Sequence, residues 1–504
     1  MITKTYSAGI VGIDGFLVTV ECSVRAGMER FELVGLPDNA VREARERVRA
    51  ACVNSGYYFP DRNILVNLAP ANRKKEGSAF DLAILVGILS AAGVIPAGEL
   101  LEGSCFVGEL SLSGEVRPAI GVLSLALAAR EAGCRTLFVP KDNAAEAAIA
   151  EGITVHGVSN FTELFLHLCG KATLPVTVFD PTVAADNRPL PDFAEVAGQQ
   201  KARRAVEIAA AGGHNLLLIG PPGSGKSMLA KRIPSILPPM TFAESCEVTR
   251  IHSVAGMAPT GLVTRRPFRS PHHTVSAAGM IGGGSNPRPG ESSLADHGVL
   301  FLDELPEYSP SLLETLRQPL EDGTVTVTRV AARANYPAGF MLVCAMNPCR
   351  CGYFGDRTHT CSCRPEDVRR YLSRISGPLL DRLDIQVEVP SLSYEELTAR
   401  RQSEPSEAIR ERVTVARERA LARSPRPNAR LSPEEVARDC TPDEGGAAML
   451  RAAFEKLGLS ARGHDKILRI ARTIADLAGS DTVTAPHIAE AIQYRTLDRK
   501  YFAR

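Results

Sequence analysis

The segment Gly220-Pro-Pro-Gly-Ser-Gly-Lys-Ser227 constrains this chain more than any other, because it matches the P-loop pattern G-x-x-x-x-G-K-[ST] without a departure. The apolar run 215–219 before it predicts a short buried strand, and residues 228–233 after it predict the start of a helix. In that context, backbone N–H groups and the helix dipole form a cradle for phosphate. The residues expected to line the cradle are Gly220, Pro221, Pro222, Gly223, Ser224, Gly225, Lys226 and Ser227.

Two side chains of this motif have expected roles: Lys226 reaches the outer phosphates of a nucleotide, and the Ser227 hydroxyl holds Mg²⁺. A second motif, Gly298-Val-Leu-Phe-Leu-Asp-Glu304, predicts an apolar strand that ends in two carboxylates. We expect Asp303 to lie beside the metal ion and Glu304 to polarise the attacking water as a general base. Together the two motifs predict an ATPase that uses ATP and Mg²⁺.

Composition bounds the remaining choices. A chain of 504 residues favours roughly two to four domains. Lys+Arg 58 and Asp+Glu 57 give a net charge of +1, so a nucleic-acid site has to be a local patch. The uncharged run 82–98 is interrupted by glycine and proline, which predicts a buried helix rather than a membrane span. Twelve cysteines without a secretory signal pattern indicate a cytoplasmic protein that does not act in a membrane.

Residues 1–170 mix strand and helix patterns and resemble the proteolytic domain of Lon proteases at 75–81, 106–118 and 118–140. A Lon-type protease needs a serine nucleophile and a lysine that activates it. The Lon pattern puts the nucleophile at Ala79, with Ser78 one position early, and the lysine at Leu123. The resemblance therefore implies an α+β domain of the ribosomal-S5 type that does not cleave peptides and that serves assembly or partner binding.

Residues 171–190 carry three prolines and little helical periodicity, which predicts a linker. It leads into a P-loop α/β core over residues 191–391. The start of that core, residues 192–200, is similar to the segment that contacts adenine in AAA+ proteins.

A basic cluster of Arg265, Arg266 and Arg269, with Phe268 among them, lies between the two P-loop motifs. It is either a loop that touches DNA phosphates or a plain surface loop. Arg329 follows a predicted strand at 323–328, and a second strand is predicted at 340–345, so a hairpin with exposed arginines would extend the DNA-binding set. The adjacent His272 and His273 cannot point the same way on regular backbone, which argues against a metal pair there.

Four cysteines form a second cluster on one short segment, residues 349–363: Cys349, Cys351, Cys361 and Cys363. Four thiolates suit tetrahedral Zn²⁺, although the C-x-C spacing is closer than structural zinc sites usually show. The alternative is a loop of reduced thiols, because a disulfide is not expected in the cytoplasm.

Three further residues resemble functional positions of AAA+ ATPases. Asn347 resembles the sensor 1 residue, a polar group aimed at the γ-phosphate or its water. Arg382 matches the arginine of a Leu-Leu-Asp-Arg segment that enters the neighbouring subunit's site in the Mg-chelatase and MCM group, unless it forms an ordinary surface salt bridge. Residues 392–504 have helical patterns and would form the lid, in which Arg462 resembles the sensor 2 arginine and Arg469 is the alternative.

The order of these parts along the whole chain resembles the ComM (YifB) family of Mg-chelatase-like AAA+ ATPases. The resemblance implies a multidomain α/β protein with a Lon-like domain, a P-loop AAA+ core and a helical C-terminal lid. It also implies a homo-hexameric ring that acts on branched or single-stranded DNA as a branch-migration helicase during recombination and natural transformation. The alternatives are a chelatase-type motor that remodels a protein partner for metal insertion, a protease, and a scaffold without hydrolysis.

Overall fold

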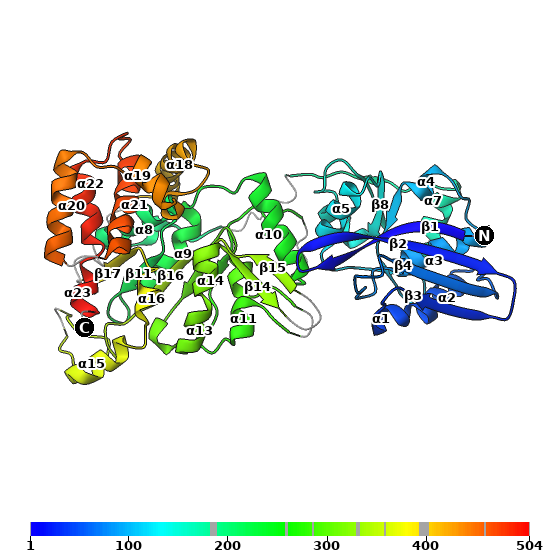
Figure 1. The fold of residues 1–504 in the computed structure, drawn as a ribbon, viewed down its shortest axis with the longest axis horizontal. Helices are drawn as coiled ribbons and strands as arrows, with labels where there is room; N and C mark the ends of the chain where they lie inside the picture. Colours follow the sequence, from blue (N-terminus) through cyan, green and yellow to red (C-terminus); the bar gives the residue numbers. More distant parts are fainter. Residues whose placement is uncertain are drawn as a thin grey trace.

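The computed structural model describes residues 2–181, 189–257, 261–284, 287–328, 333–356, 359–392, 403–457 and 460–502. The molecule is elongated, with the N-terminal part at one end, the C-terminal helices at the other and the P-loop part between them (Figure 1). None of the helices in the described ranges combines the length and the apolar character that crossing a membrane requires.

The N-terminal part is built on an eight-stranded mixed sheet in the order β10-β9-β8-β5-β1-β2-β4-β3. Side chains of β2 alternate between two cores, because successive residues of a strand point to opposite faces: Val18 packs with α3, and Leu17 packs with α5. Every residue of α3 is buried, as the uncharged run predicts. The strands are β1 Ile2–Val11, β2 Asp14–Arg25, β3 Arg30–Val34, β4 Asn63–Ala69, β5 Ser104–Phe106, β8 Thr136–Pro140, β9 Thr154–Val158 and β10 Val176–Thr177.

The helices of this part are α1 Asn39–Arg42, α2 Ala44–Asn54, α3 Asp81–Ala91, α4 Glu99–Glu102, α5 Val122–Glu131, α6 Ala144–Ala147 and α7 Phe161–Leu168, and β6 Glu109–Leu110 pairs with β7 Val116–Arg117. The predicted linker does not begin at residue 171. Val176 and Thr177 form β10, which adds an antiparallel strand to the edge of the N-terminal sheet.

The P-loop part contains a five-stranded sheet in the order β12-β13-β16-β11-β17, in which every pair of neighbours is parallel. Its strands β11, β13 and β16 are buried along their whole length, which suits a sheet covered by helices on both faces. The strands are β11 Leu216–Ile219, β12 Phe268–Arg269, β13 Val299–Leu302, β16 Met341–Met346 and β17 Ile385–Glu388. The helices are α8 Gln200–Gly212, α9 Lys226–Ile236, α10 Phe242–Val254, α11 Ala277–Ile281, α12 Glu291–Leu294, α13 Pro310–Thr315, α14 Arg317–Asp322, α15 Pro365–Leu372 and α16 Gly377–Leu380.

The hairpin in this part differs from the sequence-based prediction. Strand β14, Thr324–Thr328, pairs antiparallel with β15, Arg333–Pro337. The sequence did not predict strand β15. The predicted partner at 340–345 is instead β16 of the central sheet, because its side chains are apolar throughout and fill the interior. Arg329 lies outside the described residues.

The C-terminal part is helical, as predicted, and packs on the P-loop part through a shared hydrophobic core. Its helices are α18 Ser406–Arg423, α19 Pro433–Asp439, α20 Glu444–Leu457, α21 Ala461–Leu477, α22 Ala485–Gln493 and α23 Leu497–Tyr501. Helix α21 is the most buried of them and contacts both α8 and α22.

The turn of the β1–β2 hairpin joins the N-terminal part to the P-loop part (Figure 1). Ile13 at this turn is 6% exposed and belongs to the same core as Ile251 and Leu300. Arg250 of α10 donates to the Ile13 carbonyl at 3.0 Å and pairs with Asp14 at 2.7 Å. The first domain is therefore anchored to the second by a buried side chain and an ion pair.

Candidate nucleotide-binding and hydrolysis site

The predicted catalytic residues come from three adjacent strands. The P-loop follows β11, Asp303 follows β13 and Asn347 follows β16, and these strands are neighbours in the order β13-β16-β11. All three run parallel, so their carboxyl ends meet at one edge of the sheet, where α/β proteins bind ligands. The fold therefore collects at one place residues that are far apart in the sequence.

The P-loop holds its lysine in a defined position. The Lys226 ammonium donates to the carbonyls of Gly220 and Pro221, each at 2.8 Å, and to Oδ1 of Asn347 at 3.1 Å. Burial lowers the pKa of Lys226 to about 8, and the charge of Asp303 opposes this shift. Phosphate oxygens would raise this pKa again, because an anion stabilises the charged form of an ammonium group that has lost its water.

Glycine is required at two points of the loop, since Gly223 has φ +74° and Gly225 has φ +92°. Gln199 fixes the loop through two hydrogen bonds. Its side-chain amide donates to the Ser224 carbonyl at 3.3 Å and to the Pro390 carbonyl at 2.7 Å. Gln199 lies in the segment 192–200 that is similar to the adenine-contacting part of AAA+ proteins, but a glutamine by itself carries no spacing signal that would have identified this support of the loop.

The Ser227 hydroxyl lies 2.6 Å from Oδ2 of Asp303 and donates to it. Two hard oxygen ligands side by side at the start of a helix fit Mg²⁺, which favours one or two protein oxygens together with phosphate and water. These two residues would hold the ion, which would neutralise charge on the phosphates.

Glu304 lies next to this pair and faces outward. Its φ is +52°, its backbone N–H donates to Asp303 Oδ1 at 3.0 Å, and its side chain is 61% exposed. The Nδ1 atom of His273 lies 3.9 Å from Glu304 Oε2. The ring of His273 packs against that of His272 with centroids 4.0 Å apart and planes tilted by 35°. This arrangement is possible because the two residues lie outside regular secondary structure, whereas the expectation that they point apart applied to regular backbone. Only the fold brings His273 to Glu304, because the two residues follow different strands, β12 and β13.

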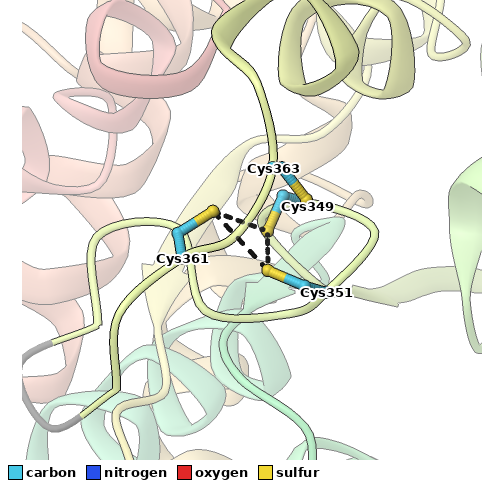
Figure 2. Close-up of side chains that lie close together, drawn as sticks. All are labelled: Cys349, Cys351, Cys361 and Cys363. Carbon is cyan, nitrogen blue, oxygen red and sulfur yellow. Dashed lines mark hydrogen bonds between the residues drawn. The ribbon is translucent and has the colours of Figure 1, made fainter.

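The four clustered cysteines converge on the loop between β16 and α15 (Figure 2). Their sulfurs all lie within 4.8 Å of one another. The Sγ atom of Cys351 lies 3.3 Å from that of Cys349 and 3.5 Å from that of Cys361, and the sulfurs of Cys349 and Cys361 are 3.7 Å apart. Tetrahedral Zn²⁺ with bonds of about 2.3 Å sets sulfurs about 3.8 Å apart, so the cluster fits the ion. Burial opposes ionisation of Cys351, but backbone N–H groups and neighbouring thiols lower its pKa to about 6.

The cysteine loop touches the P-loop. A Cβ added at Gly352, which has φ +89°, would lie 2.4 Å from Cδ of Pro222, so the Gly352 backbone packs directly on the Pro222 ring. A metal ion in the cluster would therefore also stiffen one wall of the nucleotide site.

We predict about one Zn²⁺ per chain in purified protein, lost in a Cys361→Ser/Cys363→Ser double variant because two of four ligands are removed. Elemental analysis of the protein measures this directly. The matched control is Cys169→Ser, a half-buried cysteine outside the cluster, which should keep the metal. Folded, metal-free protein with four reactive clustered thiols would contradict the prediction.

Arg382 is held inside its own chain. It pairs with Glu321 of α14 and donates to the Pro378 carbonyl, and its side chain is 10% exposed. The pair between Arg382 and Glu321 is the kind of salt bridge that the sequence left open as the alternative to an arginine directed at a neighbouring subunit. A role in a neighbouring site therefore requires the guanidinium to leave Glu321.

The two candidate sensor 2 arginines differ in their surroundings. Arg462 is exposed in the first turn of α21 and has no hydrogen-bond partner within the described ranges. Arg469, two turns later, is half-buried and donates to the Leu431 carbonyl at 2.7 Å. Arg462 is therefore the one available to a ligand.

The sequence left two alternatives open for the basic cluster, a loop that touches DNA phosphates and a plain surface loop, and two of its three arginines are engaged within the chain. Arg266 donates to the carbonyls of Pro238 and His297 at 2.6 and 2.7 Å and pairs with Glu244, so its guanidinium is committed inside the chain. Arg269 forms a two-pronged ion pair with Glu291 at 2.7 and 2.8 Å. Arg265 is half-buried and also has an interaction. Carboxylates on other elements thus pair with two of the three arginines, which composition and spacing could not reveal.

The Lon-like positions lack a Ser–Lys pair in the described structure. The Ser78 hydroxyl donates to Glu109, and the amine of Lys75 donates to the Pro70 carbonyl. Leu123 is buried in α5. Ser78 is therefore paired with a carboxylate rather than with the lysine that the Lon mechanism uses.

Comparison with known proteins bears on the whole chain. The family description "Magnesium chelatase, subunit ChlI" matches residues 192–397, with further matches to ChlI subunit regions at 20–143 and 403–495. The chain is 42% identical to competence protein ComM of Haemophilus influenzae, over 98% of this chain and 97% of that protein. It is 41% identical to protein YifB of Escherichia coli, again over 98% and 97%.

A weaker similarity to Lon proteases is consistent with the Lon-like domain. The Lon protease of Rhizobium meliloti is 25% identical over 198 residues, which is 37% of this chain and 24% of that protein. The family implies ATPase activity with ATP and Mg²⁺. The full-length matches show that this chain belongs to the ComM (YifB) family of Mg-chelatase-like AAA+ proteins.

Proposed function

We propose that this protein is an ATP-driven motor that moves on DNA as a homo-hexameric ring and migrates branches in recombination intermediates. The observation that carries the ATPase part is the convergence of Lys226, Ser227, Asp303 and Asn347 at the carboxyl edge of one parallel sheet. The DNA part is supported by the name of the Haemophilus influenzae relative, a competence protein.

Each step of hydrolysis would use residues of this protein. Lys226 exchanges the loop carbonyls for the β- and γ-phosphates, and Asn347 orients the γ-phosphate or the attacking water. Glu304 is exposed and next to Asp303, so its carboxylate can accept a proton from that water. Arg382 of one subunit would neutralise transition-state charge in its neighbour's site, which makes the site a shared one.

DNA contacts would come from the hairpin and from Arg265, rather than from the other two arginines of the basic cluster. Arg333 at the start of β15 is exposed, and Arg329, four positions earlier in the sequence, lies outside the described residues. Arg266 and Arg269 are committed to carboxylates and carbonyls, so they are poor candidates. Arg329 and Arg265 keep their proposed role as phosphate contacts, which predicts binding that weakens steeply with salt and depends little on sequence.

The test is a pair of assays on one preparation: the ATPase rate with single-stranded, duplex and four-way-junction DNA, and conversion of a labelled junction to two-armed products. Wild-type protein should be stimulated by DNA and should convert the junction with ATP. Lys226→Ala should do neither, since it removes the phosphate-binding amine. An ATPase that ignores every DNA would contradict the proposal.

The second candidate function is a chelatase-type motor that remodels a protein partner for metal insertion. The observation that favours it is the match of residues 192–397 to the magnesium chelatase subunit description. The full-length similarity to a competence protein is the observation that argues against it. ATP hydrolysis unaffected by any DNA would favour this candidate.

A further inference from the structure

The turn that carries Arg382 is held by side chains rather than by regular secondary structure. Helix α16 ends at Leu380 and strand β17 begins at Ile385, so residues 381–384 belong to neither. Their three consecutive carbonyls, on Asp381, Arg382 and Leu383, all accept hydrogen bonds from long side chains of other elements. The backbone position of the predicted arginine finger therefore depends on those side chains.

The donors come from three places. Asn215 at the start of β11 donates to the Arg382 carbonyl at 2.9 Å. Arg495, after α22, donates to the Leu383 carbonyl at 2.7 Å. Lys466 of α21 donates to the carbonyls of Asp381 and Leu383.

Lys466 has a second attachment to the same turn. Its ammonium lies 3.1 Å from Oδ1 of Asp384, and its side chain is 10% exposed. Asp384 in turn accepts from the Asn215 backbone N–H at 3.0 Å and lies 3.7 Å from His214 Nδ1. Breaking the buried ion pair between Lys466 and Asp384 carries a large energetic penalty. Helix α21 and the turn at residues 381–384 therefore move together.

Lys466 also shares a helix face with Arg462. The two residues are four positions apart on α21, which places their side chains one above the other. Arg462 is the exposed residue at the start of the helix that resembles the sensor 2 arginine. One helix thus carries both this arginine and the lysine that holds the backbone of the predicted finger.

We propose that Lys466 is a positioning residue through which α21 sets the place of Arg382, and with it the finger that one subunit offers to its neighbour. The inference rests on the proposed shared site. A misplacement of about 1 Å in such a group lowers a rate by roughly a hundredfold, so a change at Lys466 is expected to act on the neighbour's hydrolysis.

The test uses mixed rings of two inactive chains. Chains with Lys226→Ala supply the finger, and chains with Arg382→Ala supply the intact P-loop. Lys466→Met is added to one chain type at a time. If Lys466 positions the finger, it should lower the restored ATPase rate about tenfold or more when it is in the finger chain. It should have little effect in the P-loop chain, which has no finger to position.

Equal losses in both chain types, or a loss only in the P-loop chain, would overturn the inference and show a structural or own-site role. A parental mixture that restores no activity would instead overturn the shared site and this inference with it. The control is Arg472→Met, another buried cation of α21, which donates to Asp481 and Ser480 far from the turn and should act equally in both chains.

Folding is checked separately, because Lys466→Met leaves Asp384 buried without its partner. The double variant Lys466→Met/Asp384→Asn removes both charges and should give the same chain-dependent loss at a thermal midpoint closer to that of the parent. A double variant with a normal midpoint and undiminished rescue in the finger chain would refute the positioning role.

Discussion

Arg382→Ala is expected to leave ATP binding intact and to lower the rate of hydrolysis by roughly 10³–10⁵, the range over which arginine fingers act. This factor corresponds to about 4–7 kcal/mol of transition-state stabilisation. Binding should survive because Arg382 lies apart from the P-loop of its own chain and pairs with Glu321. Fluorescent-nucleotide titration and steady-state phosphate release measure the two quantities on the same sample.

Mixing identifies the subunit on which Arg382 acts. In a random one-to-one mixture of Arg382→Ala and Lys226→Ala chains, about one interface in four joins an intact P-loop to an intact finger. The mixture should therefore recover part of the wild-type rate, whereas each variant alone stays inactive. A flat mixing curve would show that the arginine acts only within its own chain.

A matched control addresses the Glu321 salt bridge. Glu321→Gln removes the charge that holds Arg382 in its own chain but keeps the size of the side chain. Activity should be kept or raised, since the guanidinium is freed to reach the neighbour. If Glu321→Gln abolished hydrolysis while Arg382→Ala did not, the salt bridge itself rather than a finger would be the functional element.

Glu304→Gln is expected to keep ATP bound and to slow turnover by roughly 10²–10⁴, because an amide cannot accept the proton of the attacking water. Binding should persist because Lys226, Ser227 and Asp303 keep their contacts. Single-turnover hydrolysis, followed with the nucleotide already bound, separates this step from binding.

The control for this change is Glu307→Gln, an exposed carboxylate three residues later that pairs with Arg374 instead of facing the site. Its turnover should stay close to that of wild type. Wild-type turnover in Glu304→Gln would refute the assignment of the base and direct attention to other groups at the strand end.

Local patterns in the sequence determined the nucleotide-binding elements. A P-loop is eight consecutive residues between a strand and a helix, so its geometry follows from contiguous backbone, and β11 and α9 lie where the motif predicts. The same holds for α3, whose unbroken apolar run fits a fully buried helix. The clustering of four cysteines on one loop also follows from short separation along the chain.

Tertiary structure decided which side chains are free to act. Arg266 and Arg269 look alike in the sequence, yet carboxylates on other elements neutralise both, and Arg382 pairs with Glu321 sixty-one positions away. His273 lies beside Glu304, and Lys466 donates to the turn that carries Arg382, only because the fold brings separate strands and helices together. Charged side chains pair through space with partners that the packing of the chain selects. Spacing along the chain therefore determined the strands, the helices and the P-loop. The fold alone determined which charged side chains remain available for chemistry.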